Sequence, residues 1–222
     1  MKKPRLSREF CYLPATVFLA LGAALMSKAN FGLSAIIAPA YLLSQILRVS
    51  FGTAEYCLQG LLVVAVCFAV RKFRWTYLLS FVSAFLYGMV LDGFLWLLSF
   101  SGEWGVILRI SMMLVGMLLS SLGVSLFFKT YLAPGAYELF VKEVSTRYGW
   151  KLSRFKVIYD SVSCLVAVIL SLAVFGSIFD RGIGIGTVLV ALVNGWIIGL
   201  FSKGLDRTFD FYDRFPFAKY FE

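Results

Sequence analysis

Long apolar runs alternate with short polar connections along the whole chain. A membrane-spanning helix needs about 20 consecutive, mostly apolar residues. Six segments meet that requirement, near residues 10–28, 53–70, 75–99, 106–128, 157–178 and 183–202. We therefore predict an all-α membrane protein with about six transmembrane helices.

Two further apolar stretches, 33–48 and 134–149, are too short to cross a bilayer. In the second stretch, apolar side chains recur at the spacing of a helix, while charged side chains fall elsewhere on its circumference. A helix of this kind either lies in the membrane interface or dips part-way into the membrane as a broken, re-entrant segment. Both alternatives stay open at this point.

The composition agrees with a membrane protein. Of the 222 residues, 60% are hydrophobic and 15% are charged, and the mean hydropathy is +0.86. Soluble domains average about 45–50% apolar and about 25% charged residues. We predict a single membrane domain over residues 1–222, which ends in a cytoplasmic amphipathic tail over residues 203–222.

The basic residues orient the predicted spans. The net charge is +9, and most Lys and Arg residues lie in the connections between apolar runs. If the N-terminus is cytoplasmic, 17 of the 21 Lys and Arg residues face the cytoplasm, which leaves Lys28, Arg48, Arg109 and Arg181 outside. Cytoplasmic loops of membrane proteins carry this excess. The bilayer, and not nucleic acid, then explains the charge, and we predict a multi-pass protein of the bacterial plasma membrane with both termini cytoplasmic.

The chain shows signs of an internal duplication. The pattern Leu21-Gly22-x-x-Leu25-x-x-Lys28 recurs 101 residues later as Leu122-Gly123-x-x-Leu126-x-x-Lys129. Two pairs of polar positions follow at nearly the same offset, namely Gln59 with Asp160 and Asp92 with Asn194. The predicted repeats cover residues 10–99 and 106–202. Each holds three spans, an odd number, so the second repeat would be inverted relative to the first, as in many transporters.

Several short motifs carry a family resemblance. They are Lys-Ala-Asn-Phe-Gly-Leu-Ser-Ala at 28–35, Phe-Gly-Thr at 51–53, Gly-x-x-x-Asp at 88–92, Gly-Ile-Gly-Thr-Val at 184–188 and Asn-Gly at 194–195. With these motifs the chain resembles the YczE/YyaS/YitT group of bacterial membrane proteins. It departs from that group's pattern at 33–35 and at 194–196. The resemblance implies a location and an architecture, and it implies no substrate.

Asp92 is the most informative single residue. It lies within the third predicted span, where a carboxylate costs at least about 2.5–3.5 kcal/mol, so it is expected to face protein or water. As a functional group it would bind a cation or a proton. As a structural group it would form a hydrogen bond with a neighbouring helix, for example with Asn194.

The other candidates are polar side chains at the two helix breaks and their symmetry partners. We expect them to line a cavity near the bilayer midplane, between the two repeats. The complete set of candidate substrate-binding residues is Asp92, Asn194, Asn30, Ser34, Tyr41, Gln45, Tyr131, Glu138 and Asp160. Asn30 and Tyr131 can equally terminate helices, and Asp160 can cap its helix or pair with nearby Lys and Arg residues.

Three further charged residues lie at predicted helix ends. Glu55 follows the start of the second predicted span, where an acid complements the helix dipole or contacts a substrate. Lys28 and Lys129 end two symmetric helices, where cations complement the opposite end of the dipole or attract anions at the two mouths of the protein.

The sequence contains no motif for chemistry. Histidine is absent, and the four cysteines show no CxxC spacing, so no metal site is expected. The signatures of zinc proteases, serine hydrolases and nucleotide-binding loops are absent as well. We predict that the protein is not an enzyme and needs no cofactor.

Two functions fit these patterns. The first is a transporter or channel for a small-molecule or ion substrate, with its cavity between two inverted repeats. The second is a substrate-binding subunit of the energy-coupling type, or a membrane scaffold, acting with a partner protein. A homo-oligomer or a complex with a partner membrane protein is compatible with both functions.

Overall fold

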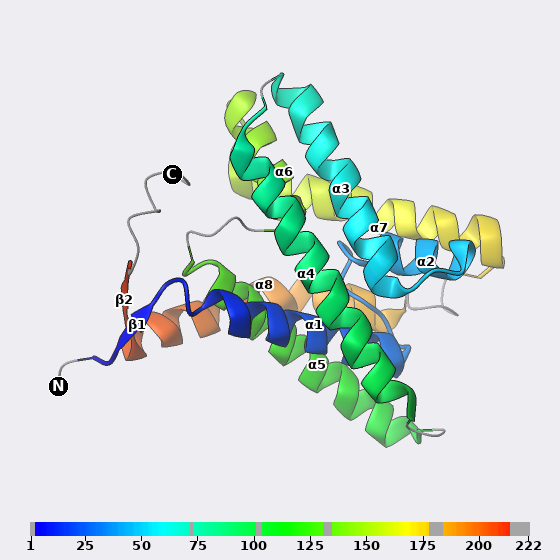
Figure 1. The fold of residues 1–222 in the computed structure, drawn as a ribbon. Helices are drawn as coiled ribbons and strands as arrows, with labels where there is room; N and C mark the ends of the chain where they lie inside the picture. Colours follow the sequence, from blue (N-terminus) through cyan, green and yellow to red (C-terminus); the bar gives the residue numbers. More distant parts are fainter. Residues whose placement is uncertain (1–2, 72, 101–103, 131–134, 178–183, 214–222) are drawn as a thin grey trace.

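The computed structural model describes residues 3–71, 73–100, 104–130, 135–177 and 184–213, and its helices dominate the fold (Figure 1). The α-helices are α1 (Tyr12–Ala29), α2 (Ala38–Leu47), α3 (Phe51–Val70), α4 (Trp75–Leu97), α5 (Val106–Phe127), α6 (Ala136–Arg147), α7 (Leu152–Phe175) and α8 (Ile185–Thr208). A 3-10 turn, η1 (Leu98–Phe100), extends α4, and two short strands, β1 (Arg5–Ser7) and β2 (Asp210–Tyr212), lie near the chain ends.

In the described part of the chain, six helices are long and apolar enough to cross a membrane, namely α1, α3, α4, α5, α7 and α8. They coincide with the six predicted spans, so the predicted fold class is confirmed. The two stretches that were too short to cross contain the short helices α2 and α6. The sequence is therefore that of an integral membrane protein with two additional short helices.

Local sequence explains where several helices begin and end. The Ser50 side chain accepts a hydrogen bond from the Thr53 amide and so caps the start of α3, as serine commonly does. Pro39 occupies the first turn of α2, where the missing N–H is not needed. Asn30 ends α1 and Gly176 ends α7, both in the left-handed conformation that stops a helix.

The centre of the fold is the antiparallel pair α1 and α5. Glycine lets the two backbones touch: a Cβ on Gly22 would lie 2.6 Å from the Gly116 carbonyl oxygen, and one on Gly123 would lie 2.7 Å from the Leu19 nitrogen. Such contact is typical of helix packing in membranes. Gly22 and Gly123 therefore allow α1 and α5 to approach closely.

The remaining helices surround this pair. α4 packs against α1, α8 against α5, and α3 against both α4 and α6, while α2 bridges α3 and α7. Half of the apolar stretch of α1 and of α5 is buried, compared with 11% for α7 and 12% for α8. α7 and α8 are therefore the peripheral helices, and most of their apolar surface suits contact with lipid.

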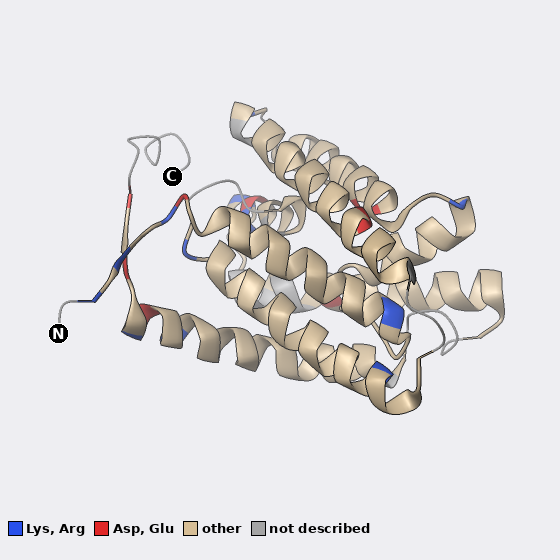
Figure 2. Cartoon of the chain, turned by 60° about the horizontal axis from the view of Figure 1, so that its bottom comes forward, with Lys and Arg blue, Asp and Glu red and all other residues tan. Residues whose placement is uncertain are grey.

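The described ends of the chain lie together at one end of the molecule (Figure 1), because β1 pairs with β2 in parallel. Charged contacts reinforce this end: Lys129 Nζ lies 2.7 Å from an Asp206 carboxylate oxygen, and Arg8 pairs with Asp213 at 3.3 Å. Figure 2 shows that Lys and Arg otherwise lie mainly near helix ends.

The predicted amphipathic tail over residues 203–222 does not begin as a separate segment in the structure. α8 continues to Thr208, and β2 follows directly. Polar residues near the end of α8 prolong the helix beyond the apolar core because helix propensity does not require an apolar side chain. The rest of the predicted tail, residues 214–222, lies outside the described residues.

The contact between α1 and α5 predicts the effect of an added methyl group. Gly22→Ala places a Cβ against the backbone of α5, so we expect the free energy of unfolding to fall by about 1–3 kcal/mol. Gly199→Ala is the matched control, because nothing lies within 4 Å of its Cβ position and alanine favours the helix by up to about 1 kcal/mol. Unfolding in detergent measures the free energy of unfolding of both variants. Equal stability of the two variants would contradict the tight α1–α5 contact.

Candidate functional site

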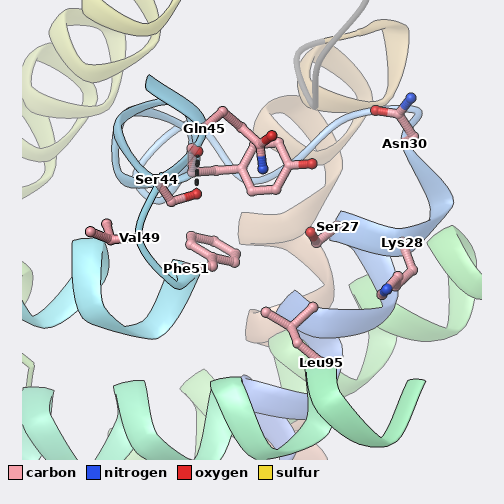
Figure 3. A pocket seen from close by; sticks show the side chains of 9 residues that line it. Ser27, Lys28, Asn30, Ser44, Gln45, Val49, Phe51 and Leu95 are labelled. Carbon is pink, nitrogen blue, oxygen red and sulfur yellow. Dashed lines mark hydrogen bonds between the residues drawn. The ribbon is translucent and has the colours of Figure 1, made fainter. Parts of the chain in front are cut away.

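A pocket of about 460 Å³ opens at the end of the molecule where α1 and α4 finish and α3 begins. Helix α2 covers one side of it (Figure 3). The lining residues are Ser27, Lys28, Asn30, Tyr41, Ser44, Gln45, Val49, Phe51 and Leu95. Four helices thus contribute to one concave surface.

The lining combines polar groups with one cation. Among the described residues that line it, Lys28 is the only charged one, and it lies in the last turn of α1. Hydroxyl and amide side chains from α1 and α2 supply further hydrogen-bonding groups. Phe51 packs edge-to-face against Tyr41, with ring centroids 5.2 Å apart. The arrangement suits a small polar solute with a negatively charged group.

Three predicted site residues meet in this pocket. Asn30, Tyr41 and Gln45 all line it. Asn30 also ends α1, so it serves both of the roles that the sequence left open. Ser34 does not line the pocket; its carbonyl oxygen accepts hydrogen bonds from the amides that open α2. Tyr131 and the side chain of Glu138 lie outside the described residues.

The loop between α1 and α2 is held by groups from the second half of the chain. Gly186 donates its amide to the Phe31 carbonyl oxygen at 2.9 Å, and Thr187 accepts a hydrogen bond from the Leu33 amide. A Cβ on Gly32 would lie 2.2 Å from the Thr187 nitrogen. Arg109 also donates to the carbonyl oxygen of Ala29 at 2.8 Å. The glycine-containing entrance to α8 thus positions the broken segment beside the pocket.

Asp92 has a structural partner, and it is α3 rather than Asn194. One carboxylate oxygen accepts a hydrogen bond from the Gly52 amide at 2.7 Å, and the other accepts one from the Ser50 hydroxyl. A Cβ on Gly52 would lie 2.0 Å from the Gly88 carbonyl oxygen, so α3 and α4 touch at this point. Asp92 therefore satisfies the first turn of α3, where amides lack helical partners.

Asn194 lies on α8 and Asp160 on α7. The Asn194 side-chain oxygen accepts a hydrogen bond from the Ser121 hydroxyl, which joins α8 to α5. Asp160 is half-buried on α7. Neither residue lines the pocket described above. The hydrogen bonds of Asp92 and Asn194 thus go to two different neighbouring helices, α3 and α5.

For Glu55, the environment in the structure differs most from the one predicted from the sequence. α3 begins at Phe51, two residues earlier than predicted, so Glu55 lies in the second turn and does not cap the helix. Its exposed fraction is 0%. Its carboxylate accepts hydrogen bonds from Gln59 Nε2 at 3.2 Å and from the Tyr137 hydroxyl at 3.1 Å. A glutamate and a glutamine one turn apart in an apolar helix were the available signal.

Gln59 and Tyr137 complete a buried polar cluster between α3 and α6. The Gln59 side-chain oxygen accepts the Ala136 amide at 3.0 Å, so it caps the start of α6. Burial raises the pKa of the Tyr137 phenol well above its usual range, and the charge of Glu55 acts in the same direction. Tyr137 therefore keeps its proton and remains a hydrogen-bond donor. We refer to Glu55, Gln59 and Tyr137 as the buried triad.

Lys28 and Lys129, which were predicted to end two symmetric helices, have different environments. Lys28 is exposed at the pocket, whereas Lys129 is paired with Asp206. Lys129 is therefore not an equivalent of Lys28 for attracting anions. In the part of the chain that the structure describes, no three Cys, Asp or Glu side chains are grouped closely enough to hold a metal ion.

The sequence matches one protein family over residues 6–203, most of its length, and that family is described as a family of unknown function (DUF6198). The chain belongs to this family. No curated protein and no solved structure matches the chain. Membership in DUF6198 assigns no substrate or reaction, so function is inferred from the geometry of the site.

The capping role of Asp92 predicts a loss of stability when its carboxylate is removed. Asp92→Ala leaves the Gly52 amide in the first turn of α3 without its acceptor, and we expect the free energy of unfolding to fall by about 1–2 kcal/mol. Asp92→Asn, which retains one acceptor oxygen, should lose less. Unfolding in detergent and amide exchange at Gly52 measure the effect.

Asp213→Asn is the control, because it removes a partly exposed ion pair with Arg8 that contributes little to stability. An Asp92→Ala protein as stable as the wild type, with unchanged exchange at Gly52, would contradict the capping role.

Proposed function

We propose that this protein is a transporter for a small polar solute that carries a negatively charged group. The observation that carries the proposal is the pocket of about 460 Å³, in which Lys28 is the one charged residue of the described lining. Ligand sites in membrane transporters commonly lie where helices are broken and helix ends face a cavity. Here the pocket lies at the break between α1 and α2, next to the first turn of α3. The proposal assigns no chemical reaction to the chain.

The size and chemistry of the lining narrow the solute class. Small-molecule sites usually have volumes of about 300–1,000 Å³, so the pocket suits a solute of modest size. Lys28 would attract a carboxylate or a phosphate, and the Gln45 and Asn30 amides would bind neutral polar groups. The edge-to-face pair of Tyr41 and Phe51 offers an apolar wall.

We also propose that the fold consists of two inverted repeats, α1–α4 and α5–α8. Matching helix pairs support this arrangement: α1 packs against α4 as α5 packs against α8, and α3 packs against α6 as α7 packs against α2. α1 and α5 run in opposite directions (Figure 1). The repeats differ in one respect, since α3 packs along α4 whereas α7 and α8 make little contact in the described part of the chain.

We further propose that both termini face the cytoplasm of a bacterial cell. The proximity of the described chain ends supports a shared side, and the excess of Lys and Arg in the connections on that side supports the cytoplasm. The pocket would then open to the outside. The resemblance to the YczE/YyaS/YitT group supports the plasma membrane as the location.

A second candidate function is that of a substrate-binding subunit or scaffold that acts with a partner membrane protein. The low burial of α7 and α8 favours it, since only 11% and 12% of their apolar stretches are covered. Copurification with a stoichiometric ATP-hydrolysing partner would support this alternative. Solute uptake by the purified chain alone would exclude the need for such a partner.

A ligand screen followed by a flux measurement tests transport. Small carboxylates, phosphates, neutral amides and amines are compared for their ability to raise the unfolding temperature of the protein in detergent. We expect anionic solutes to stabilise the wild type, by about 2.7 kcal/mol at a concentration 100 times the dissociation constant. The same solutes should enter proteoliposomes that contain the protein.

Two variants make the test specific to the pocket. Lys28→Gln should abolish both stabilisation and uptake, whereas Lys142→Gln, which makes the same charge change at an exposed position of α6, should retain both. Uptake of the stabilising solute that is equal in all three proteins would place the binding site elsewhere.

A further inference from the structure

The buried triad lies one helical turn further along α3 than the pocket. Phe51 lines the pocket, and Glu55 follows it on α3 by four residues, or about 6 Å along the helix axis. Beyond the triad, α6 continues along α3, where Ala136 and Leu139 pack against Val63 and Val66. The far end of α6 is held by Glu143, which accepts a hydrogen bond from the Tyr77 hydroxyl at 2.9 Å. The triad therefore separates the pocket from the apolar contact between α3 and α6.

The hydrogen bonds of the triad depend on the charge of Glu55. Both of its carboxylate oxygens accept a hydrogen bond, one from Gln59 and one from Tyr137. Such donors favour the ionised form of a carboxylate, whereas the apolar surroundings of a span disfavour it. A proton on Glu55 would turn one acceptor into a donor, and Tyr137 would have to rotate its own O–H to accept it.

We propose that Glu55 is a proton-binding site, and that protonation of Glu55 weakens the attachment of α6 to α3. Because Gln59 bonds both to Glu55 and to the first amide of α6, a change at Glu55 reaches the start of α6 directly. This inference rests on the proposed transport function. In that function, the proton would be the coupling ion, and the contact between α3 and α6 would close the inner side of the pocket.

The chemistry of the triad favours a proton over a metal cation. Hard cations such as Ca²⁺ take six to eight oxygen ligands, and Mg²⁺ requires a near-octahedral set. Here the Gln59 oxygen is engaged by the Ala136 amide, and the Tyr137 phenol donates to Glu55. Among the described residues, the oxygens that remain at the triad are too few for a cation site.

Among the described residues, several tyrosines from neighbouring helices lie near Glu55 or near its partner Tyr137. Tyr137 faces it from α6. Tyr159 on α7 lies with its ring centroid 6.4 Å from that of Tyr137, and Tyr87 on α4 acts electrostatically on Tyr137. From α2, Tyr41 contacts α3 one turn earlier, at Phe51. Phenols titrate near pH 10 in water, so Glu55 is the member of this group suited to exchange a proton near neutral pH.

Infrared spectroscopy of the purified protein tests proton binding without any solute. The carbonyl stretch of a protonated carboxyl group is recorded while the pH is changed between about 5 and 9, the range in which buried carboxyl groups titrate. We expect a titrating band in the wild type and in the control Glu143→Gln, and its loss in Glu55→Gln. If Glu55→Gln does not fold, Glu55→Asp replaces it, and the band should shift in frequency. A titrating band that is the same in all variants, or the absence of one from the wild type, overturns the proposal.

Amide hydrogen exchange tests the attachment of α6. Glu55→Gln mimics the protonated residue, so we expect the amides at the start of α6 to exchange about tenfold faster at neutral pH, as for the loss of one hydrogen bond to a charged group. Tyr137→Phe, which removes a donor and keeps the ring, should act similarly, and Glu143→Gln should leave these amides unchanged. Unaltered exchange in both triad variants would overturn the proposed link.

These measurements separate the two proposals. A protein that transports solute while Glu55 does not titrate would retain the transport function and lose the proton site. A titrating Glu55 in a protein that binds no solute at the pocket would retain the proton site and lose the transport function.

Discussion

The structure depends on satisfying backbone polar groups where helices stop inside apolar surroundings. A buried backbone group has no water to bond, so each buried helix end needs a partner from the protein. Side chains from neighbouring helices supply these partners: Asp92 binds the first turn of α3, Gln59 binds the first amide of α6, and Arg109 binds the last carbonyl of α1. These contacts allow two short helices, α2 and α6, to pack among six long ones.

The same requirement brings functional chemistry into the fold. Polar side chains that hold helix ends have to be buried, and a buried polar group is costly unless its hydrogen bonds are made. Around α2 the arrangement leaves a pocket lined by helix ends and amides, with Lys28 at its rim. Around α6 it leaves a carboxylate, Glu55, whose hydrogen bonds depend on its charge. The proposed solute site and the proposed proton site thus arise beside the two short helices, α2 and α6.

The spans could be predicted because their signal is local. A run of about 20 apolar residues is long enough to cross a bilayer wherever it occurs, and the six predicted segments agree with the six long helices to within a few residues. The ends were less predictable. α8 continues through polar residues to Thr208, and Glu55 lies one turn inside α3, because helix formation follows hydrogen bonding and capping and not hydropathy alone.

The sequence by itself determined that the chain is helical and apolar enough to live in a membrane, and it identified Asn30, Tyr41 and Gln45 as residues of one candidate site. It also identified Asp92 as a residue that needs a partner. Only the tertiary structure decided that this partner is the start of α3, that Asn194 binds Ser121, and that Glu55 meets Tyr137. The reason is physical: a helix that is apolar on all sides gives no periodic signal of which face meets which neighbour, so those pairings depend on how the helices pack.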